Sequence, residues 1–385
     1  MSTTHLLPTR DDVMRLDGPH RAAITVYAPT DPADAATGRA AVASGVDAGV
    51  RALRARGLTR LDEERIRAGW EEIRRGRLRE HLSRSVALYL CPALAEVWVL
   101  PNRVVPQVQA ADRFDVGQLM RAVTSAQEAF AVTLSADGWN LYRATARTRA
   151  AELPIDPTHP EDVADATNRA TVRDRSHVRR LVGYEGKKLL LEKYAARVAA
   201  AVDTELGALD PSGIAPLFLF AAEPLLSMFR SHPQRRPVHA VRGAADRLTD
   251  HAVDAAIRSG LEVANAEGVR EIADAIIHTD QRDLVAEDLS EIARGAVTGA
   301  IDTLVYDTAV DEIGELDDIT GALRFGETGS DLLSRIAVAV LAGGGHVVAA
   351  RPEELTLPSC AAGAVARLRR PLGRATATVA EPARG

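Results

Sequence analysis

The stretch Phe130-Ala-Val-Thr-Leu-Ser-Ala-Asp-Gly-Trp-Asn-Leu-Tyr142 consists of two apolar segments on either side of a short polar turn. Both segments are rich in the β-branched and aromatic residues that strands favour. The turn ends in Gly138, and glycine tolerates the positive φ that hairpin turns demand. This pattern predicts a β-hairpin, with a third strand near residues 150–154.

Two further elements belong with this hairpin. The unbroken apolar run Pro216-Leu-Phe-Leu-Phe-Ala-Ala222 is typical of a central strand that is covered on both faces. Residues 187–206 place Leu191, Tyr194 and Val198 at helical spacing, which predicts one buried face of a long helix. Together these elements indicate an α/β domain.

Similar elements lie on both sides of this region, and 385 residues exceed what one ordinary core accommodates. We expect residues 1–20 to be a polar leader and residues 116–123 to form the helix that opens the second domain. Residues 247–259 and 268–278 are predicted as separate helices of the third domain. The predicted organisation is three consecutive α/β domains, 1–112, 113–245 and 246–371, followed by a disordered tail, 372–385.

Composition excludes several classes of protein. No apolar run approaches the roughly 20 residues that span a bilayer, and the first residues lack the pattern of a signal peptide. Cys91 and Cys360 are far apart and have apolar neighbours, which predicts buried thiols rather than a disulfide. We therefore expect a cytoplasmic protein. Its net charge of −6 argues against general coating of nucleic acid, so any contact with phosphates is expected to be local.

Such a local site is suggested by residues 169–193, which hold eight basic residues and three acidic ones. Every lysine of the chain lies in this segment. Basic residues next to the flexible Gly183 and Gly186 suit the binding of phosphates, whereas the alternative is an ordinary solvated surface. His177 and Tyr184 are candidates for stacking on a base, or for simple packing within the loop. The candidate RNA-binding residues are Arg173, Arg175, His177, Arg179, Arg180, Tyr184, Lys187 and Lys188.

The motifs of common enzymes are missing from the sequence. No two histidines stand at helical spacing beside a glutamate, and two lone cysteines make no thiolate cluster, so we expect no zinc site. There is no Gly-x-Ser-x-Gly elbow and no phosphate-binding Gly-x-x-x-x-Gly-Lys-Ser/Thr loop. The carboxylates of Asp156, Asp162 and Asp165 cluster, but on a predicted loop rather than at strand ends. The sequence therefore predicts no catalytic residue, no metal and no cofactor.

The order of the elements resembles that of archaeal and eukaryotic class-one peptide release factors, and more closely that of the bacterial archaeo-eukaryotic release factor family. Besides the hairpin, the long helix and the run 216–222, three stretches carry the resemblance, over roughly residues 110–370. They are Asp112-Arg-Phe-Asp-Val-Gly-Gln-Leu119, Arg294-Gly-Ala-Val-Thr-Gly-Ala-Ile-Asp-Thr-Leu-Val-Tyr306, and the passage from Asp331 through Gly343-Gly-Gly-His346 to Arg369.

The resemblance implies an RNase H-like central domain and a C-terminal domain similar to ribosomal proteins that bind kink-turn RNA. Release factors carry Gly-Gly-Gln on a loop of the central domain, where it positions the water that cleaves peptidyl-tRNA. The corresponding residues here, about 153–187, contain no Gly-Gly-Gln, and Gly117-Gln118 falls in a predicted helix. The N-terminal part also lacks the Asn-Ile-Lys-Ser motif that reads stop codons. Both departures weigh against peptide release.

The leading hypothesis is a non-catalytic, ribosome-associated translation factor that acts in stalling, rescue or dormancy. Its expected partner is the ribosome, through rRNA or tRNA backbone, and a translational GTPase is a further candidate. Neither a membrane nor DNA is expected. Two alternatives stay open: a hydrolase that uses the RNase H-like domain, and a stress-linked module that binds another protein through the third domain.

Overall fold

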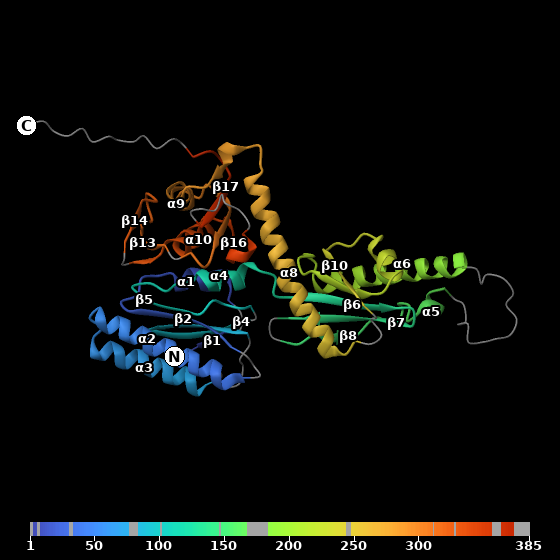
Figure 1. Ribbon diagram of the computed structural model, residues 1–385, viewed down its shortest axis with the longest axis horizontal. Helices are drawn as coiled ribbons and strands as arrows, with labels where there is room; N and C mark the ends of the chain where they lie inside the picture. Colours follow the sequence, from blue (N-terminus) through green and yellow to red (C-terminus); the bar gives the residue numbers. More distant parts are fainter. Residues whose placement is uncertain are drawn as a thin grey trace, which may run out of the picture. The chain divides into compact units, whose positions relative to one another are not determined.

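The computed structural model describes residues 3–5, 8–30, 34–76, 84–100, 102–145, 148–167, 184–243, 248–310, 312–326, 329–355 and 363–372. The chain divides into two compact units (Figure 1). One unit is formed by residues 126–267, and the other combines residues 1–125 with 268–385. Whether the chain holds three separately folding domains stays a prediction.

The unit of residues 126–267 is built on a five-stranded sheet in the order β10-β9-β6-β7-β8. The predicted hairpin is present, because β6 and β7 pair antiparallel and β8 continues that pattern. Strands β6, β9 and β10 run parallel, with Phe130 opposite Leu217. Three antiparallel strands followed by two parallel ones make the RNase H-like topology, as the resemblance implied. The strand bounds are β6 (Ala129–Ser135), β7 (Gly138–Ala144), β8 (Ala151–Leu153), β9 (Leu217–Ala221) and β10 (Val238–Arg242).

Helices cover both faces of this sheet, which explains why its central strands are apolar throughout. Helices α5 (Val163–Thr167), α6 (Tyr184–Leu209) and α7 (Leu225–Arg230) pack on the face that carries Phe130 and Leu219. The first part of α8 (Asp250–Ile277) packs on the other face, where Phe218 and Phe220 lie. Gly260 permits this approach, since a Cβ atom there would lie 2.4 Å from the Phe218 ring.

The two helices predicted over 247–259 and 268–278 are one continuous helix, α8. Gly268 does not end it, because this glycine keeps a right-handed conformation in open space. The buried side of α8 differs along its length: Val253 and Ile257 pack in one unit, and Ala273 and Ile276 pack in the other. The first part of α8 therefore belongs with the sheet of residues 126–267, beyond the predicted boundary at residue 245.

The N-terminal part of the other unit has a sheet in the order β1-β4-β3-β2-β5. One face of this sheet packs against α2 (Ala35–Ala55) and α3 (Arg60–Arg75). Helix α2 lies close to β2, because a Cβ atom at Gly45 would lie 2.6 Å from Val26 and one at Gly49 would lie 2.5 Å from Ile24. The strands are β1 (Thr3–His5), β2 (Ala23–Pro29), β3 (Ser85–Cys91), β4 (Leu94–Leu100) and β5 (Gln107–Ala111).

The C-terminal part of this unit contains a four-stranded sheet, β11-β17-β12-β16, and a three-stranded one, β14-β13-β15. The four-stranded sheet lies between the end of α8 on one face and α9 (Leu289–Val297) and α10 (Leu332–Ala342) on the other. This agrees with the expected α/β class. The strands are β11 (Val285–Ala286), β12 (Ile301–Asp307), β13 (Ile313–Leu316), β14 (Leu323–Phe325), β15 (Ser330–Asp331), β16 (His346–Ala350) and β17 (Ala364–Leu368).

The N- and C-terminal parts of this unit share one hydrophobic core. Helix α4 (Gly117–Thr124) lies inside it, where the Tyr306 hydroxyl donates to the carbonyl of Gly117 over 2.9 Å. The prediction that this helix opens the central domain is therefore wrong. The expected polar leader is also structured: Thr9 and Asp12 form a capping box that starts α1 (Arg10–Leu16), whose Leu16 is buried in the same core.

The sequence predicted two buried cysteine thiols and no membrane-spanning segment. Cys91 is a buried free thiol, as predicted, and Cys360 lies outside the described residues. No helix in the described part of the chain is both long and apolar enough to cross a membrane. The predicted tail beyond Leu372 also lies outside the described residues.

Candidate nucleic-acid interface

Three of the eight predicted RNA-binding residues, Tyr184, Lys187 and Lys188, lie in the described part of the chain. Tyr184 is the first residue of α6, and Lys187 and Lys188 are exposed on its opening turns, followed by the exposed Lys193. The side chain of Tyr184 is outside the described residues. The remaining candidates, which also lie outside them, are Arg173, Arg175, His177, Arg179 and Arg180.

The beginning of α6 extends past the edge of the core. Lys187 precedes Leu191 by four residues and Tyr194 by seven, so all three lie on the same side of the helix. Leu191 and Tyr194 are buried, at 8% and 0% exposure, whereas Lys187 is exposed. Lys187, close to the positive end of the helix dipole, is therefore in solvent although it lies on the side of the helix that is buried further along.

The three lysines lie on different sides of the first three turns of α6 rather than forming a single stripe. Successive residues of an α-helix are rotated by about 100°, so Lys187, Lys188 and Lys193 point in three different directions. Lys187 and Lys193 are separated by about 9 Å along the helix axis. This arrangement spreads positive charge around the helix end, which suits several phosphates of a backbone better than one isolated anion.

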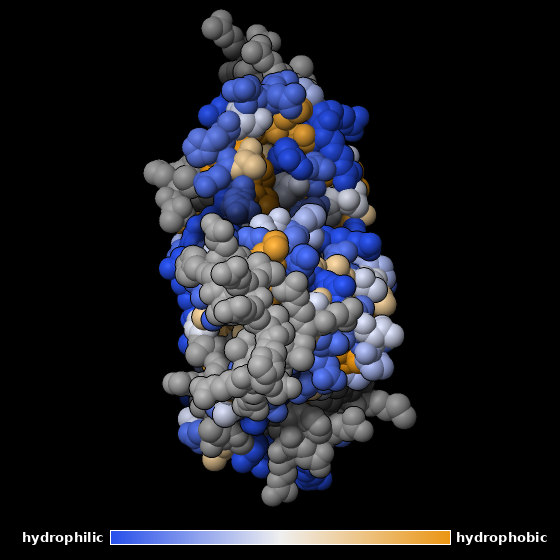
Figure 2. Space-filling model, turned by 90° about the vertical axis from the view of Figure 1, so that its right-hand side faces the viewer, coloured by the Kyte–Doolittle hydropathy of each residue, from blue (hydrophilic) through white to orange (hydrophobic). Residues whose placement is uncertain are grey.

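The lysines are accessible to phosphates, because all three side chains are exposed. Lys188 lies 3.8 Å from Glu192, and both side chains are largely exposed, at 61% and 45%. Exposed pairs of this kind contribute roughly 0–1 kcal/mol, so an incoming phosphate can replace the carboxylate at little cost. In the view of Figure 2, most of the described surface is hydrophilic, with scattered apolar residues.

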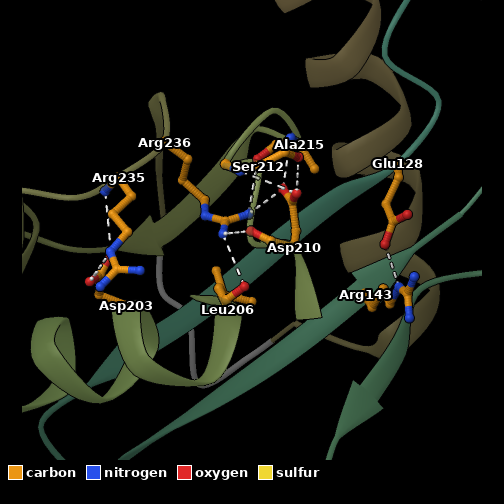
Figure 3. Close-up of polar contacts among 10 residues, drawn as sticks. Glu128, Arg143, Asp203, Leu206, Asp210, Ser212, Ala215, Arg235 and Arg236 are labelled. Atoms are coloured by element: carbon orange, nitrogen blue, oxygen red, sulfur yellow. Dashed lines mark hydrogen bonds and ion pairs between the residues drawn. The ribbon is translucent and has the colours of Figure 1, made fainter. Parts of the chain in front are cut away.

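The other end of α6 is fixed by a buried arginine. The Arg236 side chain is 2% exposed, and it donates to the Asp210 carboxylate over 3.0 Å and to the Leu206 carbonyl over 3.2 Å (Figure 3). It also donates to the carbonyls of Asp210 and Ala215, and its guanidinium lies 5.2 Å from the centre of the Phe130 ring. A cation at the C-terminal end of a helix satisfies carbonyls that lack partners within the helix. Arg236 thus ties α6 to the sheet.

Asp210 organises the turn that connects α6 to β9. Its carboxylate accepts hydrogen bonds from the Ser212 hydroxyl and from the backbone N–H groups of Gly213 and Ala215. Burial alone would raise the pKa of Asp210, but these bonds and the charge of Arg236 lower it below the usual value. Figure 3 also shows two more exposed ion pairs of this unit, Arg235 with Asp203 and Arg143 with Glu128.

The carboxylates considered for a hydrolase make local structural contacts. Asp156 accepts from the N–H and hydroxyl of Thr158, Asp162 accepts from the N–H of Asp165, and Asp165 accepts from the N–H of Glu161. These bonds shape the loop and the start of α5. Across the described ranges, no group of three or more His, Cys, Asp or Glu side chains is placed to hold a metal ion.

A cleft of about 200 Å³ lies in the unit that contains the chain's N-terminal part. Its charged lining consists of Arg21, Arg56, Asp62 and Asp112. Arg21 lies 3.6 Å from Asp62, and Arg56 lies 3.7 Å from Asp112. Because the two positive charges are balanced by two negative ones, this cleft has little net charge with which to attract a phosphate.

Sequence comparison finds a similarity for the unit with the five-stranded sheet. Residues 126–267 match the family described as bacterial archaeo-eukaryotic release factor family 11. The resemblance predicted from the sequence is therefore confirmed over these residues. No sequence among curated proteins matches the chain.

Several solved structures of related description align with most of the chain. Ribosome-bound archaeal Pelota, determined with ABCE1, is 12% identical with a TM-score of 0.37, and 96% of each chain is covered. Pelota of Archaeoglobus fulgidus is 12% identical with a TM-score of 0.37, covering 95% of this chain and 94% of that one. The archaeal termination factor aRF1 is 13% identical with a TM-score of 0.23, covering 94% and 99%.

Proposed function

We propose that the protein is a ribosome-associated factor that binds RNA backbone through residues 169–193 and does not itself release the nascent peptide. The observation that supports this most is the beginning of α6, where Lys187 and Lys188 are exposed near the positive end of the helix and the exposed Lys193 follows further along. This end lies in the unit whose sequence matches a release factor family. A partner rich in phosphate is the class of molecule that such a surface suits.

The absence of peptide release is argued from the sequence. The segment between β8 and α6 is where release factors carry their catalytic loop, and here it contains no Gly-Gly-Gln. Without that glutamine, no evident group positions the attacking water. We therefore expect the factor to recognise a ribosomal state, in stalling, rescue or dormancy, while the chemistry is left to another component. A translational GTPase and a cytoplasmic location fit this role.

Cosedimentation with purified ribosomes tests the proposal. The wild-type protein should pellet with ribosomes at low salt, and the triple variant Lys187→Ala, Lys188→Ala and Lys193→Ala should stay largely in the supernatant. Alanine is the best helix former, so these changes should leave α6 intact. Arg197→Ala is the matched control, because Arg197 is an exposed cation further along the same helix.

Three results would contradict the proposal. If the wild-type protein does not sediment with ribosomes, it does not associate with them under these conditions. Equal losses for Arg197→Ala and for the triple variant would show that the end of α6 has no special role. Release of peptide from programmed ribosomes above background would show that the protein hydrolyses peptidyl-tRNA by a route that the sequence does not reveal.

A further inference from the structure

The hairpin of β13 and β14 exposes two large apolar side chains. Ile319, in the turn, is 88% exposed, and Phe325, at the end of β14, is 59% exposed. Ile319 is the most exposed large hydrophobic side chain in the described part of the chain. A single exposed apolar residue is common on protein surfaces. Whether Ile319 can serve as a binding residue therefore depends on how rigidly the structure holds it.

The turn that carries Ile319 is fixed rather than loose. The Asp317 carboxylate accepts from the N–H of Ile319 over 3.0 Å and from the N–H of Thr320 over 2.7 Å. Gly321 has φ +72°, and a Cβ atom there would lie 2.6 Å from the Cα of Arg294 in α9. Only glycine permits this close contact with that backbone conformation. The turn therefore packs against α9, and the side chain of Ile319 is exposed to solvent.

The strand residues next to the turn are anchored as well. Leu316 and Leu323 face each other across the strands and pack against the hydrophobic core of the unit. Asp318, next to Ile319, forms an ion pair with Arg335, whose side chain is 8% exposed. The apolar tip is thus preorganised, and little conformational entropy remains to be lost when a partner binds it.

The charge around the tip indicates the kind of partner. Residues 312–326 contain four acidic residues and a single basic one, Arg324. Glu315, Asp317 and Asp318 are exposed beside the apolar tip. Such a surface repels phosphates, so it does not suit an RNA backbone. It suits a protein surface that has an apolar pocket and a basic rim, as a protein bound to RNA can offer.

We propose that this hairpin, through Ile319 and Phe325, docks onto a basic protein of the ribosome. This inference rests on the proposed ribosome association and adds a second contact that differs in chemistry from the end of α6. The lysines of α6 meet phosphate, whereas the hairpin inserts an apolar residue into a protein pocket and surrounds it with acidic groups. Exposed apolar anchors of this kind contribute a large share of the affinity at protein interfaces.

The test compares two probes, intact purified ribosomes and ribosomal RNA stripped of its proteins. The double variant Ile319→Ser and Phe325→Ser should bind intact ribosomes about tenfold more weakly than wild type, as expected for the loss of an apolar hot spot. It should bind the stripped RNA as wild type does. Ile214→Ser is the control, because Ile214 is 73% exposed and lies in the other unit. Thermal melting of each variant checks that it is folded.

A single variant addresses the charge separately. Glu315→Lys should weaken binding to intact ribosomes at low salt and less so at high salt, because the opposed charges are screened. Equal binding of the wild type and the double variant to ribosomes would overturn the proposal. An equal loss of affinity for stripped RNA would also overturn it, because the hairpin would then contact RNA. If the wild-type protein does not bind ribosomes at all, that result contradicts the proposed function and also this inference, which depends on it.

Discussion

The guanidinium of Arg121 and the carboxylate of Glu354 form a bidentate pair, with both N–O distances at 2.6 Å. Both side chains are buried, at 7% and 4% exposure. Arg121 also donates to the carbonyl of Ala349 over 2.9 Å, and Glu354 accepts from the N–H of Arg351 over 2.9 Å. The pair joins α4 to the segment after β16, although the two lie far apart in the sequence.

Breaking this pair should strongly destabilise the unit that contains it. Arg121→Ala leaves the Glu354 carboxylate buried without its partner, and such losses cost about 3–5 kcal/mol. Urea unfolding measures the change in free energy. The control is Arg60→Ala, because Arg60 and Glu64 form an exposed pair and should contribute less than about 1 kcal/mol. A similar small effect at Arg121 would contradict this account of the shared core.

Arg236 should be equally important to the unit of residues 126–267. Arg236→Met keeps much of the side-chain volume but removes the donors that hold Asp210 and the end of α6. We expect a loss of about 3 kcal/mol, together with faster hydrogen exchange in the last turns of α6. Arg235→Met is the control, since Arg235 is 67% exposed in its pair with Asp203. Unchanged exchange in α6 would mean that Arg236 does not anchor the helix.

The stability of this unit should fall at acid pH partly through Asp210. Its pKa is lower in the folded protein than in the unfolded chain, so the unfolded chain binds the proton more readily. The stabilisation is therefore present above about pH 4 and is lost as the pH falls through the folded pKa. In Asp210→Asn, the free energy of unfolding should be lower at neutral pH and should change less below pH 4. An unaltered pH profile would show that Asp210 does not titrate differently on folding.

Two glycines of α8 should respond in opposite directions to the same substitution. Gly260→Ala forces a methyl group against Phe218, and overpacking of this kind costs about 1–3 kcal/mol. Gly268→Ala meets no atom within 4 Å and should stabilise the helix by about 0.5–1 kcal/mol. Thermal unfolding of the two variants gives the comparison, and Phe218→Leu should partly restore Gly260→Ala. Equal effects at both positions would contradict the close packing of α8.

Local patterns predicted the parts of the fold that depend on neighbouring residues. The hairpin of β6 and β7, the central strand β9 and the long helix α6 follow from apolar periodicity and from the turn at residues 135–138. The placement of α4 could not be predicted in this way, because it is decided by contacts such as Arg121 with Glu354. The continuity of α8 was missed because its two halves bury different faces.

The candidate site was predictable only in part. The cluster of lysines is visible in the sequence, and the structure adds that Lys187 lies beyond the buried end of α6. Arg236 was missed because Gln-Arg-Arg-Pro at residues 234–237 reads as an ordinary charged loop. Its role depends on Asp210, on the carbonyls at the end of α6 and on the Phe130 ring, which only the folded chain brings together. The exposure of Ile319 could not be predicted, because a single isoleucine in an acidic stretch forms no periodic pattern.

The salt dependence of ribosome binding tests the central claim most directly. If three or four cations of residues 169–193 contact phosphates, log K should fall with log salt with a slope of about −2 to −3. Replacing Arg173, Arg175, Arg179 and Arg180 by alanine, together with the three lysines of α6, should both weaken binding and flatten that slope. Weaker binding with an unchanged slope, or no change in either quantity, would contradict the claim that this segment meets the RNA backbone.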